Sequence, residues 1–334
     1  MTPTVPPNAE YADANAVDPR TAGTGPQCTD AAPAGPPGPS ADPAAVSLAR
    51  VDLHGVAFDR LSEAQTVGRV LDAVSVGRGG WVITSNLDHL ARAATDADFR
   101  RMLDEADLVV ADGAPLVWAS RLQGTPLPER VAGSTLAWSL SAAAAARGAS
   151  LFLLGGDAGV AEKAAATLTD RYPGLRIAGT FFPPMGFEKD AAVMDAMRAT
   201  LRESRPDLVY VALGSPKQER LIRQLRSELG HELRQTWWLG LGISLSFICG
   251  DVRRAPVWMQ RVGLEWLHRM GQEPRRLAKR YLVTGVPFAM RLLSCAVVRR
   301  WRGPASGTGD TPPGDARRHD CGGGDGAGEK AGLK

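Results

Sequence analysis

Polar turns that directly follow apolar runs hold the residues best suited to chemistry. Asp112 follows the apolar run 108–111, and Thr84 and Asn86 stand at the end of the run 81–84. A carboxylate after a strand can accept a proton from a hydroxyl or cap a helix, and small polar side chains at a helix start often only cap it. Asp112, Thr84 and Asn86 are therefore candidate catalytic or binding residues, with capping as the alternative.

A third turn, GSPKQE at 214–219, lies between another apolar run and a helical stretch. Free amides at a helix N-terminus, with Lys217 beside them, suit a phosphate or the edge of a uracil. The alternative is an ordinary turn with Pro216 near the first helical turn. Arg130, which precedes another helix, can hold a diphosphate through two parallel hydrogen bonds or form a surface ion pair.

The elements that must position these turns alternate between short apolar runs and helical stretches from about residue 80 onward. This alternation predicts an α/β fold with a Rossmann-like, mostly parallel sheet flanked by helices. We expect strands at 81–84, 108–111, 151–154, 177–182, 208–213 and 236–239, with 243–248 continuing the last one, and helices at 87–94, 134–147, 158–170, 191–203 and 217–229. Ligands of such sheets bind at the carboxyl ends of the strands, where the three turns should meet.

Composition and charge divide the 334 residues into four parts. Residues 1–46, with ten prolines, and the Gly-rich residues 303–334 are predicted to be disordered tails, because they cannot bury enough apolar surface to offset chain entropy. Residues 47–268, the predicted α/β domain, hold 25 bases and 25 acids. Residues 269–302 hold nine bases and one acid, so most of the net charge of the ordered chain lies in this short segment.

Several classes of protein are disfavoured by missing motifs. The five histidines have no metal spacing, and no P-loop lysine motif, Gly-x-Ser-x-Gly elbow or Asp-x-Asp motif occurs. The four cysteines are scattered, which is typical of a reducing compartment, and the first residues do not resemble a signal peptide. We therefore expect a cytoplasmic protein without a bound metal or cofactor.

Six stretches occur in a familiar order: TSNLDH at 84–89, ADLVVADG at 106–113, ERVAG at 129–133, GSPKQE at 214–219, GLEWLHR at 263–269 and EPRR at 273–276. With this order and similar spacing, the chain resembles the WecG/TagA/CpsF family of glycosyltransferases from about residue 51 to 298. The resemblance implies an inverting transferase that moves a hexose-type sugar, such as an N-acetylmannosamine derivative, from a UDP-sugar to a polyprenyl-diphosphate-linked sugar. Such enzymes build cell-envelope or exopolysaccharide polymers.

The same resemblance implies roles for particular residues. Asp112 resembles the base, with Thr84 and Asn86 beside it, and Arg130 and Gln218 resemble residues of the donor site. No catalytic metal is implied, so arginines and helix amides must meet the diphosphate charge. Two positions depart from the family pattern: Thr135 and Ser246 stand where relatives often have aspartates. Both departures leave the identity of the sugar open.

The basic segment 269–302 surrounds a largely apolar stretch, 282–298, that is interrupted by Pro287 and Arg291. This pattern favours an amphipathic helical appendage lying on an anionic membrane surface, on the inner face of the cell membrane. Arg275, Arg276 and Arg280 are expected to serve lipid headgroups or the acceptor diphosphate. The alternative is a docked helix with solvated charges, whereas a nucleic-acid partner is disfavoured because the remaining core is neutral.

Two other functions would fit the same fold. A nucleotide-dependent oxidoreductase is disfavoured, because no GxGxxG with an acid about 20 residues on is present. A non-catalytic, membrane-associated nucleotide-sugar binding module is compatible with the loss of the two family aspartates, although Asp112 argues for catalysis. A homo-oligomer is compatible with the sequence, which does not determine the assembly.

Overall fold

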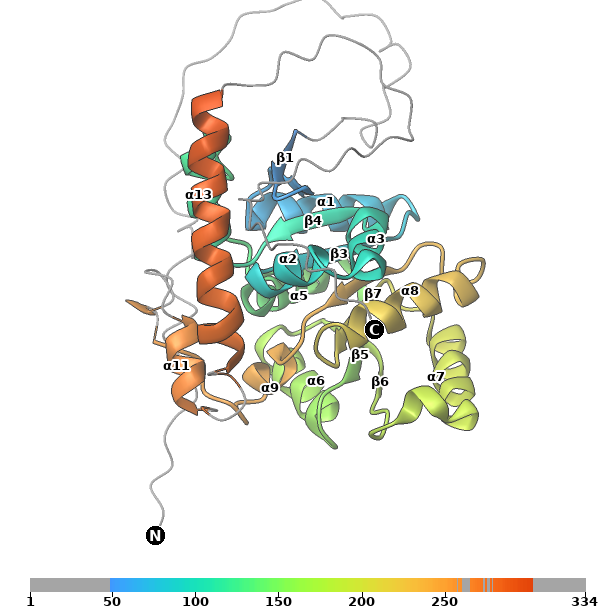
Figure 1. Cartoon of the computed structure of the whole chain (residues 1–334). Helices are drawn as coiled ribbons and strands as arrows, with labels where there is room; N and C mark the ends of the chain where they lie inside the picture. The colour runs from blue at the N-terminus through green and yellow to red at the C-terminus, as the bar shows by residue number, and fades with distance from the viewer. Residues whose placement is uncertain are drawn as a thin grey trace, which may run out of the picture.

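The computed structural model describes residues 49–256, 258, 259, 265–272, 274, 277 and 279–302. Its centre is a six-stranded sheet of order β4-β3-β8-β7-β5-β6, and every neighbouring pair is parallel. Helices cover both faces (Figure 1). The predicted α/β fold with a parallel sheet flanked by helices is thus confirmed, while both predicted tails lie outside the described residues.

The strands are the short apolar runs of the sequence. Their bounds are β3 Gly80–Ser85, β4 Leu108–Ala111, β5 Ser150–Gly155, β6 Arg176–Phe181, β7 Leu208–Ala212 and β8 Trp237–Gly240. All but β6 are buried along their whole length, which explains why they are apolar throughout rather than alternating. β6 is one of the two edge strands and is only partly buried, whereas β4 at the other edge is fully buried.

The helices divide between the two faces of the sheet, each with its own apolar core. One core contains residues of α2 Leu87–Ala93, α3 Ala97–Glu105, α4 Ala114–Gln123, α7 Ala191–Ser204 and α8 Lys217–Leu229. The other contains residues of α1 Glu63–Ser75, α5 Gly133–Arg147, α6 Val160–Arg171 and α9 Ser244–Ile248. Trp81 faces the first core and its neighbour Val82 the second, as the alternation of a strand requires.

A hairpin that the sequence did not lead us to expect precedes the sheet. β1 Arg50–Leu53 pairs antiparallel with β2 Val56–Asp59. The buried carboxylate of Asp59 accepts hydrogen bonds from Arg50 Nε at 2.9 Å and from the Val109 amide at 2.8 Å. Asp59 therefore ties the hairpin to β4, the strand that ends beside Asp112.

One predicted element is wrong. Residues 243–248 were expected to continue the last strand, but they form the short helix α9. Gly242 adopts a positive φ of 56° and ends the extended chain directly after β8. Leu245 and Ile248 of the run are buried in the second core. The run ISLSFI is only six residues long and mostly apolar, with Ser244 and Ser246 between apolar residues. A run this short cannot be assigned to a buried helix or to a strand from its pattern alone.

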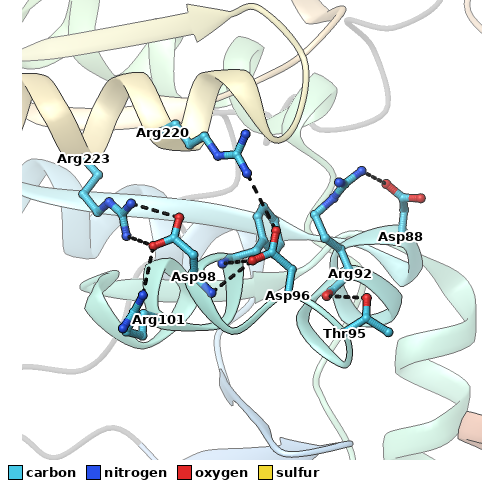
Figure 2. A network of polar contacts seen from close by, with 9 residues as sticks. Asp88, Arg92, Thr95, Asp96, Asp98, Arg101, Arg220 and Arg223 are labelled. Atoms are coloured by element: carbon cyan, nitrogen blue, oxygen red, sulfur yellow. Dashed lines mark hydrogen bonds and ion pairs between the residues drawn. The ribbon is translucent and has the colours of Figure 1, made fainter.

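Polar contacts connect α8 to α3 and its N-cap on the first face (Figure 2). Arg223 of α8 donates two hydrogen bonds of 3.0 Å to the Asp98 carboxylate of α3, and Arg101 bonds the same carboxylate at 3.3 Å. Arg220 lies 3.7 Å from Asp96, whose side chain caps α3. The arginine pair beside Asp98 lowers the pKa of that carboxyl, mainly through the Arg223 hydrogen bonds.

The C-terminal part is helical, as predicted. It comprises α11 Glu265–Gln272, a π-helical segment η4 Lys279–Gly285 and the long helix α13 Val286–Arg302 (Figure 1). Leu292 and Ala296 of α13 are buried where it packs against α4. Closer to the C-terminal end of α13, Arg299 forms an ion pair with Asp52 of the hairpin. The helix is thus docked along one side of the α/β domain.

Candidate active site

The adjacent carboxyl ends of β3 and β4 bring the first two candidate turns together. The register aligns Thr84 with Val110 and Ser85 with Ala111, and the Asp112 amide donates a 2.8 Å hydrogen bond to the Ser85 carbonyl. Thr84 is a buried residue of β3, and Asp112 follows directly after β4. The predicted meeting of these two residues at one edge of the sheet is therefore present.

Asp112 does not cap the helix that follows it, because Gly113 is the N-cap of α4 and no side chain caps that helix. Its Oδ2 instead accepts a 3.2 Å hydrogen bond from the Gly133 amide, at the start of α5. Burial raises the pKa of Asp112, and Glu265 adds to the rise, while Arg130 opposes it. A carboxylate whose charge is disfavoured accepts a proton more readily than an ordinary aspartate does.

Gly133 holds the start of α5 close to Thr84. A Cβ at position 133 would lie 2.9 Å from Thr84 Oγ1 and 3.4 Å from Leu241 Cδ2. This spacing leaves no room for a side chain between the helix and the strand. Gly133 thus contributes twice to the site, since its amide bonds Asp112 and its missing side chain admits the Thr84 hydroxyl.

Asn86 shows the capping that was its alternative interpretation. Its Oδ1 accepts hydrogen bonds from the amides of Asp88 at 3.0 Å and His89 at 3.1 Å, which caps α2. Both interactions use the oxygen of the side chain. The amide nitrogen, Nδ2, is the group through which Asn86 can donate to a ligand.

Arg130 forms an ion pair with a residue that is far from it in the sequence. Its Nη1 lies 3.1 Å from Oε2 of Glu265 in α11, and Arg254 Nε lies 3.3 Å from Oε1 of the same carboxylate. These side chains are mostly buried, with exposed fractions of 21% for Arg130, 18% for Glu265 and 11% for Arg254. Arg254 was not among the residues predicted from the sequence, and Glu265 was noted only as part of the GLEWLHR stretch.

Gln218 joins the turn before α8 to the segment after β8. Its Oε1 accepts from the Gly242 amide at 2.9 Å, and its Nε2 donates to Glu219 Oε1 at 2.8 Å. A Cβ at Gly240 would lie 2.7 Å from Gln218 Nε2, so the side chain packs directly on β8. The bonds of Gln218 therefore lie at the β7–β8 part of the sheet, two strands away from Asp112. Lys217 pairs with Glu188 at 2.7 Å.

The remaining predicted residues lie in or near the basic segment. Arg275 and Arg276 are outside the described residues, and Arg280 belongs to η4 by its backbone.

The two departures from the family pattern have local roles. Thr135 Oγ1 donates to the Ala132 carbonyl at 3.0 Å, and Ser246 is a buried residue of α9.

The charged groups gathered around Asp112 are suited to an anionic ligand. Two guanidinium groups and one carboxylate surround it, and guanidinium groups match the geometry of phosphate oxygens. Over the described part of the chain, no group of three or more His, Cys, Asp and Glu side chains could hold a metal ion. Surface hollows of 420 and 230 Å³ lie at the amino-terminal edge of the sheet, around Gly79 and Arg234, away from this site.

Comparisons with known proteins identify the family of the chain. The chain is 31% identical over 198 residues to an N-acetylglucosaminyldiphosphoundecaprenol N-acetyl-beta-D-mannosaminyltransferase of Bacillus subtilis, covering 59% of this chain and 73% of that protein. It is 34% identical over 200 residues to the protein of the same name from Bacillus spizizenii, covering 60% and 74%. Residues 51–302 match the glycosyl transferase WecG/TagA/CpsF family, which confirms the resemblance seen in the sequence. The chain therefore belongs to the WecG/TagA/CpsF family of glycosyl transferases.

Proposed function

We propose that this glycosyltransferase moves a hexose-type sugar, related to N-acetylmannosamine, from a UDP-sugar to a sugar carried on polyprenyl diphosphate. The two Bacillus relatives are named for a lipid-linked N-acetylglucosamine acceptor and for the transfer of an N-acetylmannosaminyl group, which supports both the acceptor class and the sugar. The product would serve the synthesis of a cell-envelope polysaccharide or exopolysaccharide. The donor nucleotide is inferred from the family resemblance and from the arginines beside Asp112.

The observation that carries the proposal is the position of Asp112 at the carboxyl end of β4, partly buried and bonded to the Gly133 amide, with Thr84 against Gly133. The Asp112 carboxylate takes the proton of the acceptor hydroxyl while the hydroxyl oxygen attacks the anomeric carbon of the donor. The bond from that carbon to UDP breaks on the opposite face, so the configuration inverts. The negative charge that develops on UDP is met by guanidinium groups.

The direct test is transfer from a panel of UDP-sugars to a short-chain polyprenyl-diphosphate-GlcNAc, followed by mass spectrometry of the product and by NMR of its new anomeric centre. A lipid-linked disaccharide formed from one UDP-sugar, with inverted anomeric configuration, is the expected result. Product with retained configuration would contradict the single displacement at Asp112. Binding of UDP without transfer to any acceptor would favour a binding module instead.

We propose further that α13 lies on the anionic inner surface of the cell membrane. Its docked side buries Leu292 and Ala296 against α4, whereas large apolar side chains such as Met290 and Trp301 are exposed, Trp301 by 86%. Basic residues, among them Arg299 and Arg300, flank the apolar stretch at its C-terminal end. By length and composition alone, Tyr281–Trp301 is the one segment among the described helices that could span a membrane. Docking along α4 favours a helix lying in the interface.

Vesicle sedimentation of the full chain tests this orientation. The double variant Met290→Ser/Trp301→Ser should lose most binding to anionic vesicles, because each serine removes apolar area from the exposed side of α13. Met185→Ser is the matched control, since Met185 is fully exposed near the opposite edge of the sheet. Equal binding of the two variants would contradict the proposed orientation.

A further inference from the structure

A second arginine converges on the candidate active site from a segment that follows α9. Arg254 and Arg130 are 124 positions apart, yet each contacts a different oxygen of the Glu265 carboxylate, at 3.3 and 3.1 Å. The three side chains come from the loop after α9, the loop before α5 and helix α11. The fold therefore holds two guanidinium groups at one place through a single carboxylate.

The cluster lies within electrostatic reach of Asp112. Val131, the neighbour of Arg130, donates a 2.9 Å backbone hydrogen bond to Ala111, which precedes Asp112, and Gly133 donates to the Asp112 carboxylate at 3.2 Å. In line with this position, Arg130 and Arg254 lower the pKa of the Asp112 carboxyl and Glu265 raises it. Two positive and two negative groups balance in the free chain. A diphosphate ester entering this site meets two guanidinium groups, and each of these can form paired, charge-assisted hydrogen bonds with phosphate oxygens.

The contact with Glu265 leaves Arg130 able to bind a ligand. A guanidinium group carries five N–H donors, and the bond from Nη1 to Glu265 uses one of them. Arg130 also keeps 21% of its side-chain surface exposed. The carboxylate thus orients the arginine without consuming its capacity to bind phosphate, which is the arrangement that a preorganised anion site needs.

We propose that Arg254 is a second diphosphate-binding residue of this enzyme and that Glu265 is the positioning residue that holds Arg254 and Arg130 in place. The inference rests on the proposed function, because it assigns the arginines to a substrate of that reaction. Both substrates contain a diphosphate ester, as UDP in the donor and as polyprenyl diphosphate in the acceptor. The shared ligand chemistry is therefore a diphosphate ester beside Asp112.

Isothermal titration of the full chain with UDP and with geranyl diphosphate separates the two sources without needing turnover. Arg254→Gln should weaken one of these ligands by about 10–100-fold, the loss expected for one charged hydrogen-bonding partner of about 1.5–3 kcal/mol. Loss for UDP alone assigns Arg254 to the donor, and loss for geranyl diphosphate alone assigns it to the acceptor. Arg254→Lys keeps the charge but not the planar fork, and should show a smaller loss of the same ligand.

Arg253→Gln is the matched control, because Arg253 is the exposed neighbour on the same loop. This variant should bind both ligands within about twofold of wild type, as expected for a surface charge. Unchanged affinity of Arg254→Gln for both ligands, while the wild type binds UDP, would overturn the inference and leave the proposed function intact. A wild-type chain that binds neither ligand would overturn both.

Two measurements test the role of Glu265: the direction in which Glu265→Gln changes ligand affinity, and the additivity of its effect with that of Arg254→Gln. Glu265→Gln should weaken the same ligand with an unchanged melting temperature. The double variant with Arg254→Gln should lose less affinity than the sum of the two single losses, because part of the effect of Glu265→Gln acts through Arg254 and the rest through Arg130. A tighter complex with Glu265→Gln would show that Glu265 competes with the ligand rather than positioning its arginines. Additive losses would separate the two residues and overturn the positioning role.

Discussion

Asp112→Asn removes the charge of the candidate base and little else. The carboxylate accepts one hydrogen bond, from the Gly133 amide at 3.2 Å, and the oxygen of an asparagine can accept the same bond. The substitution therefore leaves α5 attached and the site in shape. Without the negative charge, the asparagine side chain cannot accept the proton of the acceptor hydroxyl.

A positioned base contributes about 10²–10⁴-fold, so the rate of sugar transfer should fall by at least about 100-fold, or roughly 2.7 kcal/mol. Because burial raises the pKa of Asp112, kcat/KM of the wild type should fall on the acid side at a pH above the ordinary aspartate value of about 3.9. The residual activity of Asp112→Asn should lack that acid limb. Initial rates between pH 4 and 8 measure both effects.

The same pKa shift predicts the effect on stability. A carboxyl with a raised pKa binds its proton more tightly in the folded chain than in the unfolded chain, so its ionisation costs stability above the unfolded pKa. At pH 7, Asp112→Asn should therefore melt no lower than the wild type. Asp157→Asn, an exposed carboxylate after β5, is the control and should change neither activity nor melting temperature.

Two results would refute this reasoning. Transfer by Asp112→Asn within about tenfold of wild type would move the base to another group, since general bases contribute more than this. A fall in melting temperature of more than about 3 °C, the shift for roughly 1 kcal/mol in a domain of this size, would contradict the cost assigned to the buried charge.

Three further substitutions test the fold around the site. Asp98→Asn should lower the melting temperature at pH 7, and the difference from wild type should vanish as pH falls below 3.8, because the pKa lowered by Arg223 gives a stabilisation that is present only while Asp98 is ionised. Gly133→Ala should lower the free energy of unfolding by about 1–3 kcal/mol in chemical denaturation and reduce sugar transfer, because its Cβ would lie 2.9 Å from Thr84 Oγ1. Full stability and activity would show that β3 moves to make room for the methyl group. Leu292→Ala should cost about 2–5 kcal/mol if α13 unfolds with the domain, and a separate early transition would show that it docks independently.

Local sequence signals predicted most of the sheet and the residues at its edge. Leu108–Ala111 and Lys217–Leu229 begin and end where their patterns indicated, because turn and capping residues bound them on both sides. Asp112 and Thr84 could be placed together because parallel strands end at a common edge. The segment 243–248 was interpreted wrongly, because a six-residue, mostly apolar run with two serines is compatible with a short buried helix as well as with a strand.

The charged cluster could not be predicted in the same way. Arg130 and Glu265 are 135 positions apart, and neither has a local pattern that points to the other. Arg254 looked like any surface arginine in a polar loop, although only 11% of its side chain is exposed. Contacts of this kind depend on how the loop after α9 and helix α11 return to the sheet edge, which is decided by packing rather than by spacing.

The place of β8 in the sheet has a consequence for how the enzyme assembles during synthesis. β8 is the last strand in the described part of the chain, yet it lies between β3 and β7, pairing Gly80 with Trp237 on one side and Leu208 with Trp237 on the other. Until it leaves the ribosome, the half-sheet that carries Asp112 and the half-sheet that leads to Gln218 each present an open parallel edge. Such edges fold slowly and attract other chains. We therefore expect nascent chains shorter than about 240 residues to need chaperones, and the two halves of the catalytic edge to join only in the final step of folding.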